Sequence, residues 1–441
     1  MQAGVAAGAE ANAPASRVEE SVRGKVRLRL AYACTLIMFM SSLDRVNVSF
    51  AAHQMNEAVG LSPSLYGFGA GIFFVGFLIA QFPSVYLLKL ISAPRWFFTL
   101  MLTWGAAATA MAFLQSPEMY YALRVVLGLA EGGLAPGMVL YLSGFTSERD
   151  RAGNFAAPML AIPISIVLGA PISAWLMSMH DNPLGLPGWR WMFLIEGLPT
   201  ILLAILALFH FPRTPAEAKW LTSEEKAWIA ENNSMRVRPS APRTRGAFTN
   251  PWLWVSAAIW FCLLGGAYGI IFWLPQVIRQ FADLSEVEVG FVAALPWVGA
   301  LIGMFWNPRH SDKTGERFWH VALPALVAGA AYAIAVWTPP TVSIVLLFIG
   351  GLGLGAAQGA FWAIPTKLFS PAVMATGIVA VNIAGSSSGM ITPWLIGVVR
   401  ERTNDFTIPI YIVGLLLVMA AALTVWAKFA GARSFAAPDA R

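Results

Sequence analysis

The sequence has little charge for its length. Only 12% of its 441 residues are Asp, Glu, Lys or Arg, whereas 57% are apolar. A soluble domain carries about 25% charged residues, so this deficit indicates an integral membrane protein. The net charge of +6 does not indicate a nucleic-acid-binding surface, because the basic residues are scattered over short loops.

The sequence has only two cysteines and five histidines, and its first residues lack the features of a signal peptide. Cys34 and Cys262 both lie in apolar segments, which indicates neither a disulfide framework nor a metal site. The five histidines lie in or near loops and form no H-E-x-x-H motif. We therefore expect no enzyme activity, no metal and no cofactor. Residues 1–22 lack the apolar core of a signal peptide, so the first span is expected to direct the chain to the membrane.

Apolar segments of about 20 residues, the length that crosses a bilayer, recur along the chain. One long polar break separates the first six from the last six, and capping-box sequences within it, at Thr214–Glu217 and Thr222–Glu225, predict short surface helices. The predicted spans are 28–52, 65–90, 96–114, 119–144, 154–178, 190–211, 251–281, 288–307, 318–337, 341–365, 371–399 and 406–428.

This pattern predicts an all-α membrane protein with twelve transmembrane helices in two six-helix bundles, which is typical of secondary transporters. We expect a monomer that contacts membrane lipids and binds no nucleic acid. The predicted parts are a disordered cytoplasmic tail (1–27), an N-terminal bundle (28–211), a cytoplasmic middle loop (212–250), a C-terminal bundle (251–430) and a cytoplasmic tail (431–441).

The basic residues predict how the chain is oriented in the membrane. With the N-terminus inside, 23 of the 29 Lys and Arg lie on the inner side, and four lie on the outer side: Arg190, Arg279, Arg400 and Arg402. Positively charged loops stay on the cytoplasmic side of a membrane. Both termini are therefore expected in the cytoplasm.

Asp44 and Arg45 are adjacent opposite charges in the first apolar segment. Only 14 uncharged residues separate Arg29 from Asp44, which is about 21 Å of helix and short of the roughly 30 Å hydrocarbon core. The helix must continue through both charges, unless they sit at the outer interface of a very thin membrane. Neighbouring residues on a helix point about 100° apart, so the two side chains can have separate roles. Charges inside a span usually face a bundle interior or a cavity.

The fourth span carries complementary charges. Arg124 and Glu131 are seven residues apart, which places them on one helix face about 10 Å apart along the axis. A GxxxG spacing from Gly128 predicts close helix packing, and Pro136 can bend the helix beyond it. By depth in the membrane, Asp44 and Arg124 are expected to pair. The alternative is that these charges form only interhelical salt bridges.

The two halves differ in their intramembrane charges. Glu196, near the start of the sixth span, is a further acid in the first half, and we expect it to form structural hydrogen bonds. The spans of the second half contain almost no ionisable group, so any proton carriers are expected in the first half. The glycine run GGLGLGAAQG at 350–359 predicts close helix packing, because no strand precedes it to form a phosphate-binding loop.

Several of these segments resemble a known family. LDRVNVSFA at 43–51, the RxxxGxxxG pattern from Arg124 and GWRWMFLIEGLP at 188–199 resemble the anion:cation symporter family of the major facilitator superfamily. NPRHSDKTGER at 307–317 is similar to the superfamily's cytoplasmic loop signature. The likeness runs from about Arg29 to the last span, and LDRVNVSFAAHQMN is most similar to tartrate and phthalate carriers of bacteria.

The resemblance implies proton-driven uptake of a small organic anion by alternating access across a bacterial inner membrane. It also implies roles for charged residues in the first bundle and for cavity-lining residues in the second. These residues are Arg45 for the substrate carboxylate, Asp44 and Glu131 for protons, Arg124 as the partner that modulates them, and Trp362 and Asn382 in the cavity wall.

Other functions fit the same fold. An exporter or antiporter of amphipathic compounds suits the many aromatic residues, but an arginine at mid-depth favours an anion. A transporter-like sensor usually has a soluble signalling extension, and we expect none here. The mostly apolar cavity residues of the second half favour a compact hydroxy-dicarboxylate such as tartrate, or an aromatic carboxylate, over a long polyhydroxy acid.

Overall fold

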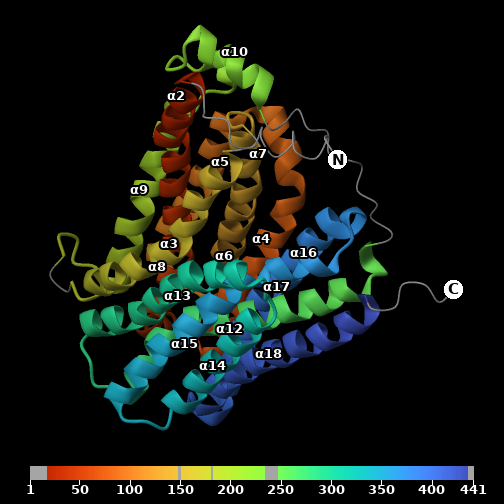
Figure 1. The fold of residues 1–441 in the computed structure, drawn as a ribbon. Coiled ribbons are helices and arrows are strands. Elements are labelled where there is room, and N and C mark those ends of the chain that lie inside the picture. Colours follow the sequence, from red (N-terminus) through yellow and green to blue (C-terminus); the bar gives the residue numbers. More distant parts are fainter. Residues whose placement is uncertain (1–16, 148–149, 180–181, 234–246, 436–441) are drawn as a thin grey trace.

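The protein is almost entirely helical (Figure 1). The structure, a computed structural model, describes residues 17–147, 150–179, 182–233 and 247–435. Within these ranges ten helices are long and apolar enough to cross a membrane. Two further helices, α14 (Trp319–Ala335) and α17 (Pro371–Thr403), complete the twelve spans. The expected all-α fold with twelve transmembrane helices is confirmed.

The first bundle contains six spans, and two of them are divided. The elements are α2 Arg17–Val26, η1 Arg27–Ala31, α3 Tyr32–Val59, α4 Pro63–Ile91, α5 Ala93–Ala110, η2 Met111–Phe113, α6 Pro117–Gly132, α7 Leu134–Ser143, α8 Arg151–Met177 and α9 Gly188–His210. The first span runs from α2 through the π-helical stretch η1 into α3. The fourth span consists of α6 and α7.

The second bundle repeats this plan, with its own fourth span divided. Besides α14 and α17, its elements are α12 Pro251–Phe281, α13 Glu286–Thr314, α15 Pro340–Phe361, α16 Ala363–Leu368 and α18 Thr407–Phe435. Helix α18 continues into the tail expected at 431–441, of which residues 436–441 lie outside the described ranges.

Short helices form in the middle segment between the bundles. Helix α10 (Ser223–Asn232) begins with the expected capping box, in which the Thr222 hydroxyl and the Glu225 carboxylate each accept the other residue's backbone N–H. The other expected box produces only the 3₁₀ turn η3 (Pro215–Glu217), because Thr214 makes no capping hydrogen bond.

The first helix begins earlier than predicted. Residues 17–26, expected in a disordered tail, form α2, while residues 1–16 lie outside the described ranges. Lys25 Nζ contacts both carboxylate oxygens of Glu225 at 2.7 and 2.8 Å, and the Ser21 hydroxyl donates to the same carboxylate at 2.7 Å. Burial raises the pKa of Glu225, but these hydrogen bonds outweigh it and lower the pKa to about 2. A partner 200 residues away therefore stabilises α2.

Two corresponding spans break at the same distance from a proline. Helix α6 ends at Gly132, four residues before Pro136, and α15 ends at Phe361, four residues before Pro365. Proline has no N–H to donate to the carbonyl four residues earlier, and its ring crowds that carbonyl. The helix is interrupted one turn before Pro136, where a bend was expected, and the second bundle repeats this interruption.

Glycines bring helices into backbone contact in both bundles. A Cβ atom at Gly128 of α6 would lie 2.0 Å from the Phe73 carbonyl oxygen of α4. A Cβ atom at Gly351 of α15 would lie 1.9 Å from the Pro296 carbonyl oxygen of α13. Both close-packing patterns predicted from the sequence are confirmed. We refer to these contacts as the glycine seams.

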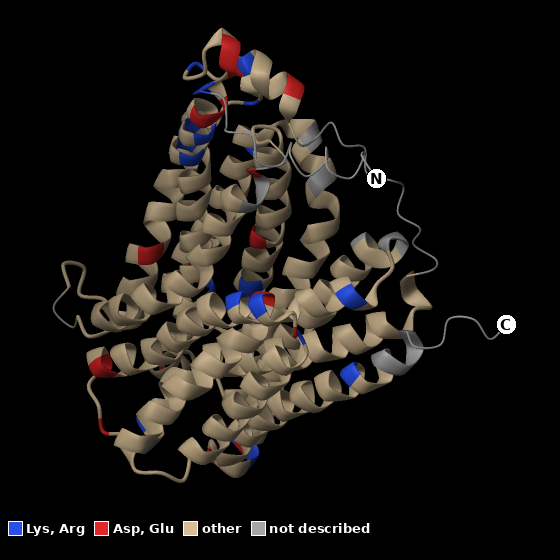
Figure 2. Cartoon of the chain, in the orientation of Figure 1, with Lys and Arg blue, Asp and Glu red and all other residues tan. Residues whose placement is uncertain are grey.

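The two bundles meet at one end and separate at the other. We name the end with α2 and α10 the terminus side and the opposite end the hairpin side. On the hairpin side, the Tyr66 hydroxyl donates to the Phe272 carbonyl at 2.9 Å, and the Ser62 hydroxyl donates to Glu401 at 2.9 Å. The terminus-side ends of the bundles, at α7 and α16, stand apart (Figure 1). Charged residues gather around α2 and α10, and most of the ribbon between the helix ends is uncharged (Figure 2).

Candidate functional site

A cavity of about 560 Å³ lies between the two bundles. Helices α3 and α8 line it from the first bundle, and α12, α13 and α15 line it from the second. Most of the lining side chains are apolar or aromatic, and Arg45 is the only charged residue among the lining residues that the structure describes. A cavity of this size and composition suits one small molecule held by a few polar groups.

Arg45 forms an ion pair at the wall of this cavity. Its Nη2 lies 2.8 Å and its Nε 3.2 Å from Glu131 Oε2 on α6. The Ser41 hydroxyl, one helical turn before Arg45, donates to the same oxygen at 2.9 Å. The Glu131 side chain is fully buried, whereas 15% of the Arg45 side chain is exposed. Arg45 therefore faces the cavity, and Glu131 lies behind it.

Aromatic rings position the Arg45 guanidinium. Its central carbon lies 5.3 Å from the centre of the Phe73 ring and 5.1 Å from that of Phe77, both on α4. Glu131 Oε1 is buried without a hydrogen-bond partner, so the ion pair engages one carboxylate oxygen only. An unpaired buried oxygen is unfavourable for a carboxylate, and it leaves a position at which a proton can attach.

Arg124 does not pair with Asp44, so the pairing expected from depth alone is wrong. Arg124 Nε and Nη2 donate to the carbonyl oxygens of Gly69 and Ala70 on α4, at 3.3 and 3.2 Å. Its guanidinium lies over the Phe73 ring at 4.9 Å. The glycine seam explains this geometry, because it places the α4 backbone directly against α6. Arg124 is a buried cation held by backbone dipoles.

Asp44 points away from Arg45, as the helical angle predicts. Asp44 Oδ2 accepts a hydrogen bond from the Thr200 hydroxyl on α9 at 3.3 Å. Glu196, one turn before Thr200, accepts from the Ser173 hydroxyl of α8 at 2.6 Å. Both carboxyl groups are buried, and within the described residues neither forms an ion pair with a basic side chain.

The second bundle supplies an aromatic wall. Trp260 of α12 stacks on Phe361 with 4.6 Å between ring centres and meets Trp362 at 5.0 Å. Trp362, which the resemblance implies in the wall, lines the cavity. The Trp260 Nε1 and Gln358 Nε2 donors are buried without a hydrogen-bond partner. Because buried donors are usually paired, the Gln358 amide is available to an acceptor in the cavity, whereas the Nε1 edge of Trp260 faces Gly385 of α17.

Asn382 is not brought to this cavity. It is half-buried on α17 and is absent from the described lining residues. Trp260 packs against α17 so closely that a Cβ atom at Gly385 would lie 2.2 Å from Trp260 Cδ1. The Trp260 ring therefore occupies the space between that part of α17 and the cavity. A role for Asn382 in substrate binding stays a prediction.

Among the residues that join the site without having been expected from the sequence are Ser41, Thr200 and Trp260. Ser41 has a recognisable signal, because it precedes Arg45 by four residues and so shares its helix face. Thr200 follows Glu196 at the same spacing. Trp260 has no such signal among the 18 tryptophans. The described residues contain no group of three or more His, Cys, Asp or Glu that could hold a metal ion.

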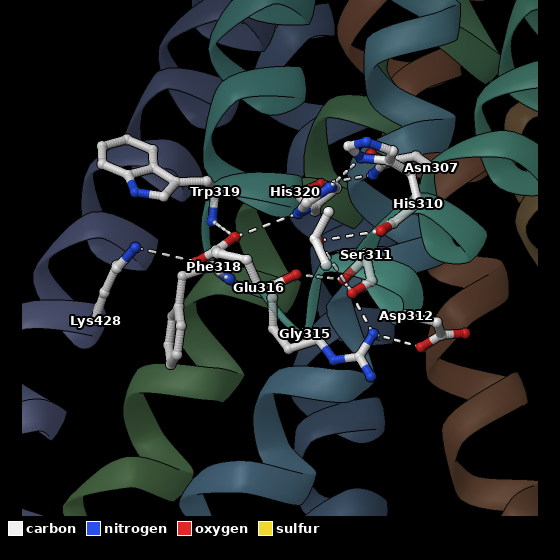
Figure 3. Close-up of polar contacts among 12 residues, drawn as sticks. Asn307, His310, Ser311, Asp312, Gly315, Glu316, Phe318, Trp319, His320 and Lys428 are labelled. Atoms are coloured by element: carbon white, nitrogen blue, oxygen red, sulfur yellow. Dashed lines mark hydrogen bonds and ion pairs between the residues drawn. The ribbon is translucent and has the colours of Figure 1, made fainter.

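A polar network joins α13, α14 and α18 on the terminus side (Figure 3). His310 Nδ1 and His320 Nε2 lie 2.7 Å apart, and His320 Nδ1 lies 3.3 Å from Glu316 Oε2. Lys428 Nζ of α18 contacts Glu316 Oε1 at 3.1 Å. Partial burial raises the pKa of Glu316, but its contacts with Lys428, His320 and the Trp319 N–H outweigh this and hold the pKa below its usual value.

Comparisons with known proteins agree with this architecture. A sequence model described as the Major Facilitator Superfamily matches residues 34–393. A protein of Agrobacterium vitis named "Putative tartrate transporter" is 39% identical over 412 residues, which cover 92% of this chain and 91% of that protein. A "Quinolone resistance transporter" of Acinetobacter baumannii is 30% identical over 420 residues, which cover 93% of this chain and 96% of that protein.

A solved structure shares the fold at low sequence identity. It is the crystal structure of a bacterial homolog of the human lysosomal transporter Spinster, in an inward-facing and occupied conformation. The TM-score is 0.73 at 17% identity, and the match covers 91% of this chain and 97% of that chain. At this identity the likeness shows the arrangement of helices alone.

Proposed function

The chain belongs to the Major Facilitator Superfamily, and from that premise we propose that it imports a small organic anion together with protons. The observation that carries the proposal is the Arg45–Glu131 ion pair at the cavity wall, with 2.8 Å between Nη2 and Oε2. A guanidinium binds a carboxylate through paired N–H donors, and here a carboxylate of the protein holds that position. A substrate carboxylate must displace Glu131 in order to bind.

Charge balance then couples the substrate to a proton. An uncompensated charge in a buried site is strongly unfavourable. If Glu131 stayed ionised, an anion on Arg45 would leave one unpaired negative charge beside the cavity. A proton on Glu131 removes that charge and frees the guanidinium for the substrate. We assign Asp44 as a further proton carrier, and Arg124 as the fixed cation whose charge favours proton release from Glu131.

The arrangement of the bundles supports one step of an alternating-access cycle. The hairpin side is closed by contacts such as that between Tyr66 and Phe272, and the bundles separate toward the terminus side. The bias of basic residues supports a cytoplasmic location for the terminus side. The Arg45–Glu131 pair then belongs to the empty carrier after substrate release. Rocking of the two bundles would return this carrier to the outward-facing state.

The cavity favours an acid with one ionised carboxylate. Arg45 is the only charged group among its described lining residues, and the opposite wall is aromatic. Gln358 offers a neutral donor to an acceptor at the far end of the substrate. An aromatic carboxylate satisfies these conditions. A hydroxy-dicarboxylate such as tartrate, supported by the 39% identical relative, satisfies them when its second acid group is protonated.

Uptake into proteoliposomes tests the proposal, with labelled tartrate and labelled phthalate as probes. An inward proton gradient should drive accumulation by the wild type. Glu131→Gln should still exchange labelled acid across the membrane but should accumulate less of it than the wild type, because one coupled proton is lost. Glu57→Gln changes an exposed glutamate on α3, the helix that carries Arg45; it is the control and should accumulate acid normally. Accumulation by Glu131→Gln equal to that of the wild type would rule out its proton-coupling role.

The second candidate function is proton-coupled export of amphipathic compounds, and the quinolone resistance relative favours it. The two mechanisms predict opposite effects of pH on binding. In symport the proton and the anion bind together, so affinity for the acid rises as the pH falls. In antiport a cationic substrate competes with the proton, so affinity falls with the pH. Thermal-shift titrations with tartrate, phthalate and a quinolone at a series of pH values distinguish them.

A further inference from the structure

A second pair of buried carboxyl groups lies apart from the substrate cavity. Asp44 is 1% exposed and Glu196 is 3% exposed, and neither is among the described lining residues. Helices α3, α8 and α9 enclose them through their contacts with Thr200 and Ser173. The exchange of Glu131 for a substrate carboxylate on Arg45 requires neither of them.

Each of these carboxyl groups has one bonded and one unbonded oxygen. Asp44 Oδ2 and Glu196 Oε1 accept hydrogen bonds from hydroxyl groups at 3.3 and 2.6 Å. Asp44 Oδ1 and Glu196 Oε2 are buried without a partner. Asn47 Nδ2 beside Glu196 and Trp104 Nε1 of α5 beside Asp44 are also buried, and neither makes a hydrogen bond of normal geometry. A purely structural network usually satisfies its buried polar atoms, and this one leaves four unsatisfied.

In the part of the chain that the structure describes, no cation compensates the pair. Asp44 and Glu196 lie close enough to repel each other when both are ionised, and Glu131 adds to that repulsion. The guanidinium of Arg45 is engaged by Glu131, and Arg190 lies at the hairpin-side end of α9. Helices α5 and α8 bring no ionisable residue to this depth. Two ionised carboxylates without a counter-ion are strongly disfavoured, so the pair must hold at least one proton.

The hydrogen-bond partners suit a group that changes its protonation state. The hydroxyl groups of Thr200 and Ser173 can donate to an ionised carboxylate, and after rotation they can accept from a protonated one. A guanidinium or ammonium partner could only donate. This pair therefore has partners in either state, in contrast to Glu131, whose partner Arg45 favours the ionised form.

We infer that Asp44 and Glu196 form a second proton-binding site, separate from the substrate pair, and that Glu196 binds and releases a coupled proton there. This inference rests on the proposed symport. One proton on Glu131 balances the substrate carboxylate, so a proton at the second site is additional. It raises the number of protons carried with each acid molecule by one.

The proton-to-acid ratio tests the inference. In proteoliposomes loaded with labelled tartrate, the pH gradient that just balances a set tartrate gradient gives this ratio. Glu196→Gln should carry one proton fewer per tartrate than the wild type and should still accumulate tartrate under a steep pH gradient. Asp44→Asn should lower the ratio by the same amount, and the double variant should lower it no further, because the two residues share one site.

Controls keep this result separate from the proposed function and from misfolding. Glu57→Gln should keep the wild-type ratio, and Ser173→Ala should keep the ratio while changing the pH at which uptake is half-maximal. Gel filtration and thermal unfolding check that each variant is folded, and Glu196→Asp should restore the ratio. An unchanged ratio in folded Glu196→Gln overturns the inference while leaving symport intact. Absence of pH-driven accumulation in the wild type overturns symport itself.

Discussion

The two bundles share a helical plan but differ inside. Each packs its second and fourth spans along a glycine seam and breaks the fourth span four residues before a proline. Among the described residues, the first bundle buries four acidic or basic side chains within its helices: Asp44, Arg124, Glu131 and Glu196. In the second bundle, no described Asp, Glu, Lys, Arg or His is buried, and the buried polar side chains are Ser, Thr and Asn.

The comparison shows how one backbone arrangement serves two purposes. In the first bundle the seam presents carbonyl oxygens of α4 to the cation Arg124. In the second, a carbonyl on the seam helix α15, that of Ala356, accepts from the neutral amide of Asn307 at 2.8 Å. The first bundle therefore has the ionisable groups that the proposed function requires, and the second presents a neutral, largely aromatic wall to the cavity.

The largest expected effect comes from removing the cavity's charge. Arg45→Gln should lower tartrate or phthalate uptake by about 100-fold or more, because losing one partner of a buried charge pair costs about 2–5 kcal/mol. Arg309→Gln removes an exposed arginine from the second bundle and should leave uptake unchanged. Similar losses in both variants, measured as initial rates in proteoliposomes, would contradict the division between the bundles.

Substitutions in the two glycine seams should lower the stability of the protein by similar amounts. Gly128→Ala and Gly351→Ala each place a methyl group within about 2 Å of a backbone carbonyl and should destabilise the protein by about 1–3 kcal/mol. Gly24→Ala is the control, because a Cβ atom there meets nothing within 4 Å. Thermal unfolding in detergent measures the effect, and destabilisation in one bundle alone would show that the seams are not equivalent.

A smaller effect is expected in the aromatic wall. Gln358→Leu should raise the KM for the transported acid about fivefold, since one hydrogen bond contributes about 1 kcal/mol, and should leave the proton-to-acid ratio unchanged. Gln276→Leu is a matched control, because its amide nitrogen is also buried and unpaired but lies outside the described cavity lining. A changed ratio in Gln358→Leu would place coupling chemistry in the second bundle.

The smallest effects are expected at the terminus side, where each bundle has a lysine–glutamate contact. Lys25→Met and Lys428→Met should each lower stability by at most about 1 kcal/mol. The pKa of Glu225 is lowered from 4.5 to about 2, so its stabilising contribution is complete above about pH 4.5 and is lost as the pH falls toward 2. The difference in melting temperature between Lys25→Met and the wild type should shrink over that interval. A constant difference would exclude Glu225 as the responsible partner.

Much of the architecture follows from the sequence. Twelve apolar segments were sufficient to predict the number and approximate limits of the spans, because the thickness of the hydrocarbon core sets the length of a helix that crosses it. Asp44 and Arg45 belong inside the first span for the same reason, and the angle between neighbouring helical residues correctly separates their directions. GxxxG and the glycine run correctly identify the seams.

The tertiary structure decided which charges meet. The depth of a residue in the membrane gives its position along the bundle axis, and by depth alone Asp44 lies level with Arg124. The direction of a side chain also depends on the rotation of its helix, which turns Asp44 toward Thr200 and Arg45 toward Glu131. Helix α2 depends on Glu225, and Trp260 fills the space between α17 and the cavity. No local pattern encodes these contacts, because each joins segments far apart in the chain. The sequence by itself determined the spans and the charges within them, and only helix packing determined their partners.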